Sequence, residues 1–434
     1  MPKPPTSAFC ARSMTLGAVL MLSCILVGKL FIAPLFSDLS EPSEQQTLRL
    51  VQDSLTQHSI FDPSRKELLL AGAAAMVNAL NDPYADYVSP EDVREFKEES
   101  TGMQIGIGIL LNSDAEVVFP LPNSDAALKG ISPGDSLLEI DGKNVSLAAS
   151  SDITSSLRGR HGTTVKLKLQ RHNGDIYSVE VMRQRVPTLT VTDERIIDKE
   201  HGIAHLTITS FASSTPDEIT AALQRLDTAG MQALILDLRF NLGGQLNDAI
   251  AVVSHFLRGD LVCRLRPHSG EELLKYADLQ LSSHPDLPLV VLVNELSASG
   301  SEVVVAALRD HQRATSMGMR TYGKGVFQKV LSFRNPNFAI KFTAGYYLTP
   351  DGEMIEGNIG ESNFSGGLLP DIVLERQNEA QCSAIRAWSH RPRVPEKYQA
   401  IVNDLFPDFQ RLAPPADNWV DSAAEFLIAN SQKL

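Results

Sequence analysis

The 434-residue sequence predicts a multidomain α/β (α+β) fold, with a core of mixed sheet and flanking helices, an inserted small domain and a helical amino-terminal region. The first observation is length, because one compact core rarely holds so many residues. The second is that residues 102–186 consist mostly of short β-type runs broken by Gly and Asn turns. The third is that apolar strands alternate with amphipathic helices through residues 187–375, the pattern of a sheet covered by helices.

Residues 1–37 predict a membrane-spanning segment. Lys3 and Arg12 precede an apolar run from Met14 to Gly28, and a second run from Leu30 to Phe36 makes the stretch long enough to cross a bilayer. Because cations precede these runs and acidic residues follow them, the rest of the chain is expected on the extracytoplasmic, periplasmic side. An uncleaved anchor in the inner (cytoplasmic) membrane and a cleaved signal peptide that leaves a secreted protein both fit this pattern.

Residues 38–101 are expected to be mainly helical. Residues 39–60 are polar and favour a helix, 66–80 carry Leu, Ala and Met at helical spacing, and a charged helix is expected over 90–99. The small domain that follows is expected to have strands at 105–111, 116–119, 136–140, 164–170 and 177–182, and helices at 124–129 and 149–157.

The core from 187 to 375 is expected to contain buried strands separated by helices. The strand and helix patterns alternate at 203–208, 216–229, 233–238, 247–257, 287–293 and 301–309. Residues 376–434 contain several prolines around short helical pieces and are predicted to form a helical appendage.

The composition narrows the possible functions. A net charge of −13 without a cluster of Lys and Arg argues against nucleic-acid binding. The ten histidines are dispersed and no metal-ligand spacing occurs, so neither a metal nor a cofactor is predicted. The sequence also lacks a GxSxG turn and a Walker loop, which argues against a His-dependent hydrolase and an NTPase. A Cys263–Cys382 disulfide would require an oxidising compartment.

Ser299 lies where an apolar strand gives way to a loop of small residues and then to an apolar helix. Ser299 and Glu302 fit a capping box, which would give the serine a purely structural role. The same turn would also expose a nucleophilic hydroxyl and aim the amides of the helix start at a developing oxyanion. The local sequence leaves both interpretations open.

No histidine is placed to activate this serine, whereas Lys324 could serve as the base in its neutral form. The pKa of a free lysine, about 10.4, would have to fall by several units, which burial among apolar residues achieves. Lys324 lies between two glycines, with no carboxylate between Asp310 and Asp351. On an extended strand Lys324 and Gln328 would share one face, so that Gln328 could orient the amine. The alternative is a solvated turn lysine.

A set of ordered motifs across roughly residues 65–375 resembles the carboxyl-terminal processing proteases, also called tail-specific proteases, which are Ser-Lys peptidases with a PDZ domain. The order and number of these motifs make the resemblance specific. The motifs are DPYADY at 82–87, GIGI at 106–109, GISPGDSLLEIDG at 130–142, LRGRHG at 157–162, LDLRFNLGG at 236–244, SASGSE at 297–302, GKGVFQ at 323–328 and LPDI at 369–372.

The resemblance implies a serine endopeptidase that cleaves protein substrates at or from their carboxyl-terminal region through an acyl-enzyme. It implies Ser299 as the nucleophile, Lys324 as the general base and Gln328 as the residue that positions the lysine. The backbone amides of Gly243 and Gly300 would form the oxyanion hole. A PDZ domain at 102–186 would bind apolar carboxyl-terminal tails and gate the site of the protease core at 187–375. Its binding loop would consist of Ile105, Gly106, Ile107, Gly108 and Ile109.

Four features depart from the family pattern. Gly300 replaces an alanine, Leu242 replaces a proline, Gly345 replaces an arginine, and 361–367 looks like an insertion. None of these changes removes a catalytic side chain, so they bear on rate and substrate preference.

Three alternatives to an active Ser-Lys protease remain from the sequence. The first is a catalytically inactive PDZ scaffold or binding protein of the cell envelope. The second is a His-dependent PDZ protease, although the sequence lacks the GNSGG-like loop that carries the catalytic serine of such enzymes. The third is an envelope structural protein whose motifs are only ancestral. Expected partners are protein or peptide substrates with apolar carboxyl termini, the membrane through its anchor, and a second copy (a homo-oligomer) or an adaptor protein, but not nucleic acid.

Overall fold

The computed structural model describes residues 43–93, 96, 103–145, 148–187, 189–268, 270–357, 366–391, 393–407, 409 and 414–430. The chain divides into two compact units, Met1–Met76 and Val77–Leu434. Within the described ranges no helix is long and apolar enough to cross a membrane, and the predicted anchor at 1–37 lies outside them. The first unit contains α3 (Glu44–His58) and most of α4 (Arg65–Asn78).

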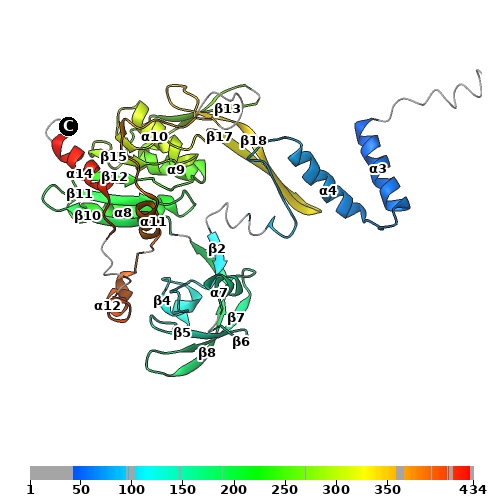
Figure 1. Cartoon of the computed structure of the whole chain (residues 1–434), viewed down its shortest axis with the longest axis horizontal. Coiled ribbons are helices and arrows are strands. Elements are labelled where there is room, and N and C mark those ends of the chain that lie inside the picture. The colour runs from blue at the N-terminus through cyan, green and yellow to red at the C-terminus, as the bar shows by residue number, and fades with distance from the viewer. Residues whose placement is uncertain are drawn as a thin grey trace, which may run out of the picture. The chain divides into compact units, whose positions relative to one another are not determined.

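The second unit contains a six-stranded mixed sheet (Figure 1). Three strands in the middle of this sheet are buried at every position and are mainly apolar, as expected for strands that are covered on both faces. The first pair across the sheet is antiparallel and each later pair is parallel. In order, the strands are β10 (Val191–Asp198), β11 (Ile203–Ile208), β12 (Ala233–Asp237), β15 (Leu289–Val293), β16 (Thr315–Gly318) and β19 (Ile372–Val373).

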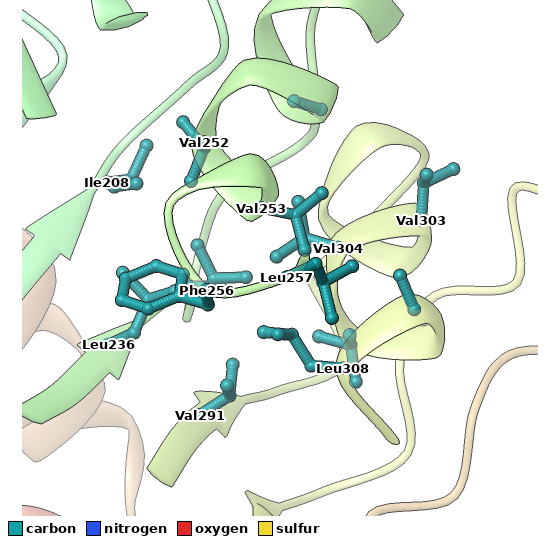
Figure 2. Close-up of a cluster of buried hydrophobic side chains, with 14 of the residues drawn as sticks. Ile208, Leu236, Val252, Val253, Phe256, Leu257, Val291, Val303, Val304 and Leu308 are labelled. Carbon is teal, nitrogen blue, oxygen red and sulfur yellow. The ribbon is translucent and has the colours of Figure 1, made fainter. Parts of the chain in front are cut away.

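Two helical layers cover the faces of this sheet. One layer consists of α8 (Thr215–Thr228), α9 (Leu246–Ser254) and α10 (Gly300–Asp310), and Figure 2 shows side chains from this cluster meeting those of the strands. The other layer is α14 (Asn418–Asn430), whose Trp419 packs against the alternate strand residues. Each fully buried large apolar side chain contributes about 1.5–3 kcal/mol relative to exposure. Because the buried side chains of α14 form one cluster with the strands, α14 is a layer of the core, and the prediction that 376–434 is an appendage is wrong for this helix.

The remaining helices of the carboxyl-terminal segment contact two different domains. α11 (Glu379–Ser389) meets the core sheet, where Thr192 Oγ1 donates a hydrogen bond of 2.5 Å to the last carbonyl of the helix. α12 (Glu396–Leu405) instead buries Val402 against Val118 of the inserted domain. Cys263 and Cys382 are both free thiols, so no disulfide joins them.

A second sheet contains a long β-hairpin, formed by β17 (Val326–Arg334) and β18 (Asn337–Leu348). This hairpin was not predicted from the sequence. β18 also pairs with β1 (Asp86–Val88), which brings the segment before the inserted domain onto the core. The sheet is completed by β13 (Leu261–Pro267) and β14 (Leu273–Tyr276).

The inserted domain is mainly β, as predicted, and encloses its own apolar core. The expected strand at 105–111 is divided in two, because the backbone of Gly108 takes a φ of 74° that a continuous strand does not adopt. Its elements are β2 (Met103–Gly106), β3 (Ile109–Leu111), β4 (Val117–Pro120), α6 (Asp125–Leu128), β5 (Ser136–Ile140), β6 (Lys143–Asn144), α7 (Ser150–Leu157), β7 (Thr164–Gln170), β8 (Ile176–Met182) and β9 (Gln184–Pro187).

A buried ionic network joins the core sheet to α14. His205 places Nδ1 3.0 Å from Asp193 Oδ2 and Nε2 3.3 Å from Asp237 Oδ2. Arg239 in turn bonds both Asp237, at 2.5 Å, and Asp417, at 2.6 Å, just before α14. Burial opposes the charge of His205, but its hydrogen bonds to the two carboxylates outweigh burial and raise its pKa from 6.5 to about 9.

This network predicts a loss of stability at alkaline pH. A histidine whose folded-state pKa is raised contributes fully below pH 6.5 and loses that contribution as the pH rises through about 9. We expect the free energy of unfolding, measured by urea denaturation, to fall by about 3 kcal/mol across this window. The His205→Gln variant should remove most of this slope, whereas His201→Gln, at an exposed histidine, should keep it. An unchanged slope in His205→Gln would contradict the assignment.

Candidate active site

Ser299 lies at a sharp turn between β15 and α10. Its backbone has φ 54° and ψ −112°, a strained conformation for a residue with a Cβ. The turn is held from the loop after β12, where the Asn241 carbonyl accepts hydrogen bonds from Ala298 N at 3.0 Å and Ser301 Oγ at 2.9 Å. Strain of this kind persists only where surrounding contacts enforce it, and it is typical of a functional turn.

Glu302 joins the loop of Ser299 to the loop of Lys324. Its Oε2 accepts hydrogen bonds from Ser299 N at 2.8 Å and Lys324 N at 2.9 Å. Its Oε1 accepts from Thr321 Oγ1 at 2.6 Å and Gly323 N at 2.7 Å. Burial raises the pKa of Glu302, while these four hydrogen bonds act in the opposite direction. The two residues predicted as nucleophile and base thus have backbone nitrogens bound to one carboxylate oxygen.

Lys324 is half-buried, and its pKa is lowered from the ordinary value. Burial is the main cause, and repulsion from Lys341 adds to it. The pKa of Lys324 is raised by the negative charges of Glu356, Glu302 and Asp82, but they do not restore its ordinary value. A lowered lysine pKa is the direction that a general base requires. Within the described residues, no hydrogen bond joins the Lys324 amine to Ser299.

Gln328 contacts Tyr84 rather than Lys324. Its Nε2 donates a hydrogen bond of 2.6 Å to the Tyr84 carbonyl, and no bond to the Lys324 amine is present in the described part of the chain. The expectation that Lys324 and Gln328 share one face of a strand is wrong. Lys324 precedes β17, and a register shift between Phe327 and Gln328 interrupts the alternation of side chains.

The two glycines predicted for the oxyanion hole lie against each other. A Cβ placed on Gly243 would come within 3.0 Å of Gly300 N. The Gly243 N–H donates a 2.8 Å hydrogen bond to Asn241 Oδ1, whereas the Gly300 N–H makes no hydrogen bond within the described residues. Of these two amides, the Gly300 N–H is therefore free to donate to an oxyanion. The Gly243 N–H could do so only if the oxyanion displaced Asn241 Oδ1.

The predicted PDZ loop lines a groove of about 290 Å³ in the inserted domain. The residues Ile105, Gly106, Ile107, Gly108 and Ile109 all contribute to it. Ile153 and Leu157 of α7 also line the groove, so apolar side chains dominate its walls.

Protein-family models match two parts of the chain. The PDZ domain model matches residues 92–170, and the model of peptidase family S41 matches residues 202–374. A probable CtpA-like serine protease of Staphylococcus epidermidis is 30% identical over 366 residues, which cover 83% of this chain and 72% of the relative. The chain belongs to peptidase family S41. It is a serine-type peptidase that acts on protein substrates.

One further relative and one solved structure are also similar to the chain. A second probable CtpA-like serine protease, from Staphylococcus haemolyticus, is 30% identical and covers 86% of this S41 peptidase and 74% of its own length. The solved photosystem II D1 C-terminal processing protease aligns with 76% of this chain and 92% of its own, at 24% identity and a TM-score of 0.45.

Two departures from the family pattern occupy tightly packed positions. A Cβ on Gly345 would lie 2.3 Å from the Arg266 carbonyl oxygen and 2.6 Å from the Phe327 ring, so this S41 peptidase has no room there for the arginine. A Cβ on Gly300 would lie 3.1 Å from the Phe211 ring. Leu242, in contrast, is exposed. Most of the apparent insertion at 361–367 lies outside the described residues.

From the sequence, Glu302 was predicted only to cap a helix, and no individual role was predicted for Asn241 or Tyr84. Each lies inside a quoted motif, so the motifs carried the information needed to suspect them. Their contacts could not be inferred, because each connects loops that are distant in the sequence.

Gly243→Ala is expected to damage the site more than the fold. Its φ is 100°, and the added Cβ would lie 2.8 Å from both Ala298 O and Ser299 Cβ. We expect kcat/KM to fall by about 100-fold or more, because displacement of the nucleophile by a fraction of an ångström is sufficient. Gly230→Ala is the matched control, since its φ is 91° and a Cβ there would meet nothing within 4 Å. Equal activity losses in both variants would attribute the effect to backbone strain alone.

Proposed function

We propose that this S41 peptidase cleaves peptide bonds with a Ser299–Lys324 dyad. Neutral Lys324 takes the hydroxyl proton as Ser299 Oγ attacks the peptide carbonyl, and then delivers that proton to the leaving amine. Water resolves the resulting acyl-enzyme. The Gly300 amide receives the oxyanion, joined by the Gly243 amide once it releases Asn241. The observation that carries this proposal is the Glu302 carboxylate, which binds the backbones of both Ser299 and Lys324.

We also propose that the inserted PDZ domain binds apolar carboxyl-terminal tails and gates the site. Supporting this, the apolar groove is lined by the glycine-containing loop, and the positive φ of Gly108 interrupts the strand there. An extended tail could add to such an edge through backbone hydrogen bonds while its apolar side chains enter the groove. Gating follows if tail binding favours the active arrangement of the core.

The test uses the full chain as wild type, Ser299→Ala and Lys324→Ala. Each is incubated with an unfolded protein ending in apolar residues and with the same protein ending in two aspartates. We expect wild type to degrade the apolar-tailed protein faster and both folded variants to be inactive. If wild type binds the tail but never cleaves, the scaffold alternative is correct. If Lys324→Ala keeps full activity, Lys324 is not the base.

We propose an extracytoplasmic location, with the chain held at the membrane by residues 1–37. The support is the charge asymmetry around the apolar runs. Alkaline phosphatase fused after residue 43 should be active, because that enzyme matures only after export. An inactive fusion would place the body on the other side.

A further inference from the structure

The turn Asp82-Pro83-Tyr84 lies against the amine of Lys324. The Nζ of Lys324 is 5.0 Å from the centroid of the Tyr84 ring. The carbonyl of the same tyrosine accepts the 2.6 Å hydrogen bond from Gln328. One residue therefore contacts both members of the GKGVFQ motif to which the family resemblance assigns a role.

This turn is fixed to the hairpin that carries Gln328. Asp82 accepts hydrogen bonds from Tyr84 N at 2.9 Å, within its own turn, and from Thr343 N at 2.8 Å and Thr343 Oγ1 at 3.1 Å. Thr343 is the β18 partner of Gln328 on β17. β1 pairs with β18 directly after the turn. The position of the Tyr84 ring is thus set by the hairpin rather than by a free loop.

We propose that Tyr84 is a positioning residue for the general base, and that Gln328 acts on Lys324 through Tyr84. The ring forms an aromatic wall that restricts the amine and keeps water from one side of it. Gln328 holds the tyrosine backbone and therefore holds the wall in place. This inference rests on the proposed role of Lys324.

The wall affects the two protonation states of Lys324 in opposite ways. Exclusion of water disfavours the ammonium, whereas the face of an aromatic ring attracts it. The other charged groups that act on the amine are Lys341, Glu356, Glu302 and Asp82. Burial is the largest cause of the lowered pKa, so opening the wall should raise the pKa of Lys324.

The test compares Tyr84→Ala, Tyr84→Phe and Tyr87→Ala in the full chain, with kcat, KM and the pH profile measured on one peptide substrate. For Tyr84→Ala we expect kcat to fall about 10-fold or more with little change in KM. The acid limb of the pH profile, where Lys324 becomes protonated, should move to higher pH. Phe restores the wall, so Tyr84→Phe should recover most of kcat and the original limb. Tyr87→Ala removes an aromatic from the same segment, where its ring packs on Phe338, and should leave the limb in place.

Three outcomes would overturn the inference. One is a wild-type pH profile in Tyr84→Ala while Lys324→Ala is inactive. Another is an acid limb of the pH profile that shifts as far in Tyr84→Phe as in Tyr84→Ala, which would assign the effect to the tyrosine hydroxyl. The third is additive loss when Gln328→Ala and Tyr84→Ala are combined, because residues acting through one another are not additive. Full activity in Lys324→Ala would instead refute the proposed base, so the two failures are distinguishable.

Discussion

Glu302→Ala should abolish most activity and destabilise the protein, although Glu302 performs no chemistry. The carboxylate is fully buried and satisfies four donors from two loops. Each of the four donors left unsatisfied costs at least about 1 kcal/mol, so we expect the free energy of unfolding to fall by about 4 kcal/mol or more. Because the loops of Ser299 and Lys324 would separate, kcat/KM should fall by about 100-fold or more.

Glu302→Gln distinguishes geometry from folding. Glutamine keeps one acceptor oxygen, but its NH2 group faces two of the four donors, so activity should fall while the protein still folds. Glu295→Gln is the matched control on the same loop, because Glu295 pairs with Arg376 in an exposed position and should contribute less than about 1 kcal/mol. Wild-type kcat/KM in Glu302→Gln would show that the carboxylate does not hold the two loops together.

Arg239→Met should also produce a large loss of stability. The Arg239 side chain is 2% exposed and neutralises both Asp237 and Asp417. Among the described residues, its removal leaves buried Asp237 with His205 as its one charged partner, which costs about 3–5 kcal/mol. The carboxylate before α14 also loses its link to the sheet. Thermal or urea unfolding would measure the change.

Arg258→Met is the control for this substitution. Arg258 pairs with Asp286 where both side chains are well exposed, and such pairs contribute about 0–1 kcal/mol. If Arg239→Met is as stable as Arg258→Met, apolar packing of Trp419 and its neighbours is sufficient to dock α14. The ionic network would then be dispensable.

The elements that depend on local pattern could be predicted from the sequence. The strand expected at 164–170 coincides with β7, and that at 203–208 with β11. The β17–β18 hairpin was missed, because polar and charged residues interrupt its apolar pattern. The bulge before Gln328 depends on pairing with β18, which no local pattern records.

The motifs located Ser299 and Lys324 without showing how the protein brings them together. That connection is the Glu302 carboxylate, and a capping-box pattern cannot reveal that its acceptor is shared with a second loop. The engagement of Gly243 by Asn241 likewise needed coordinates, because a glycine motif identifies a backbone position but not the direction of its N–H.

The place of α14 in the chain has a consequence for biosynthesis. α14 follows every strand of the sheet that it covers, and more than 200 residues separate β11 from it. A growing polypeptide therefore completes all six strands while one apolar face is still bare, which favours slow folding and exposes it to aggregation. Until α14 docks, Arg239 also lacks its ion pair with Asp417, and Arg239 lies in the segment that leads to Gly243. Peptidase activity should accordingly appear late in maturation, after the polypeptide has been synthesised through residue 430.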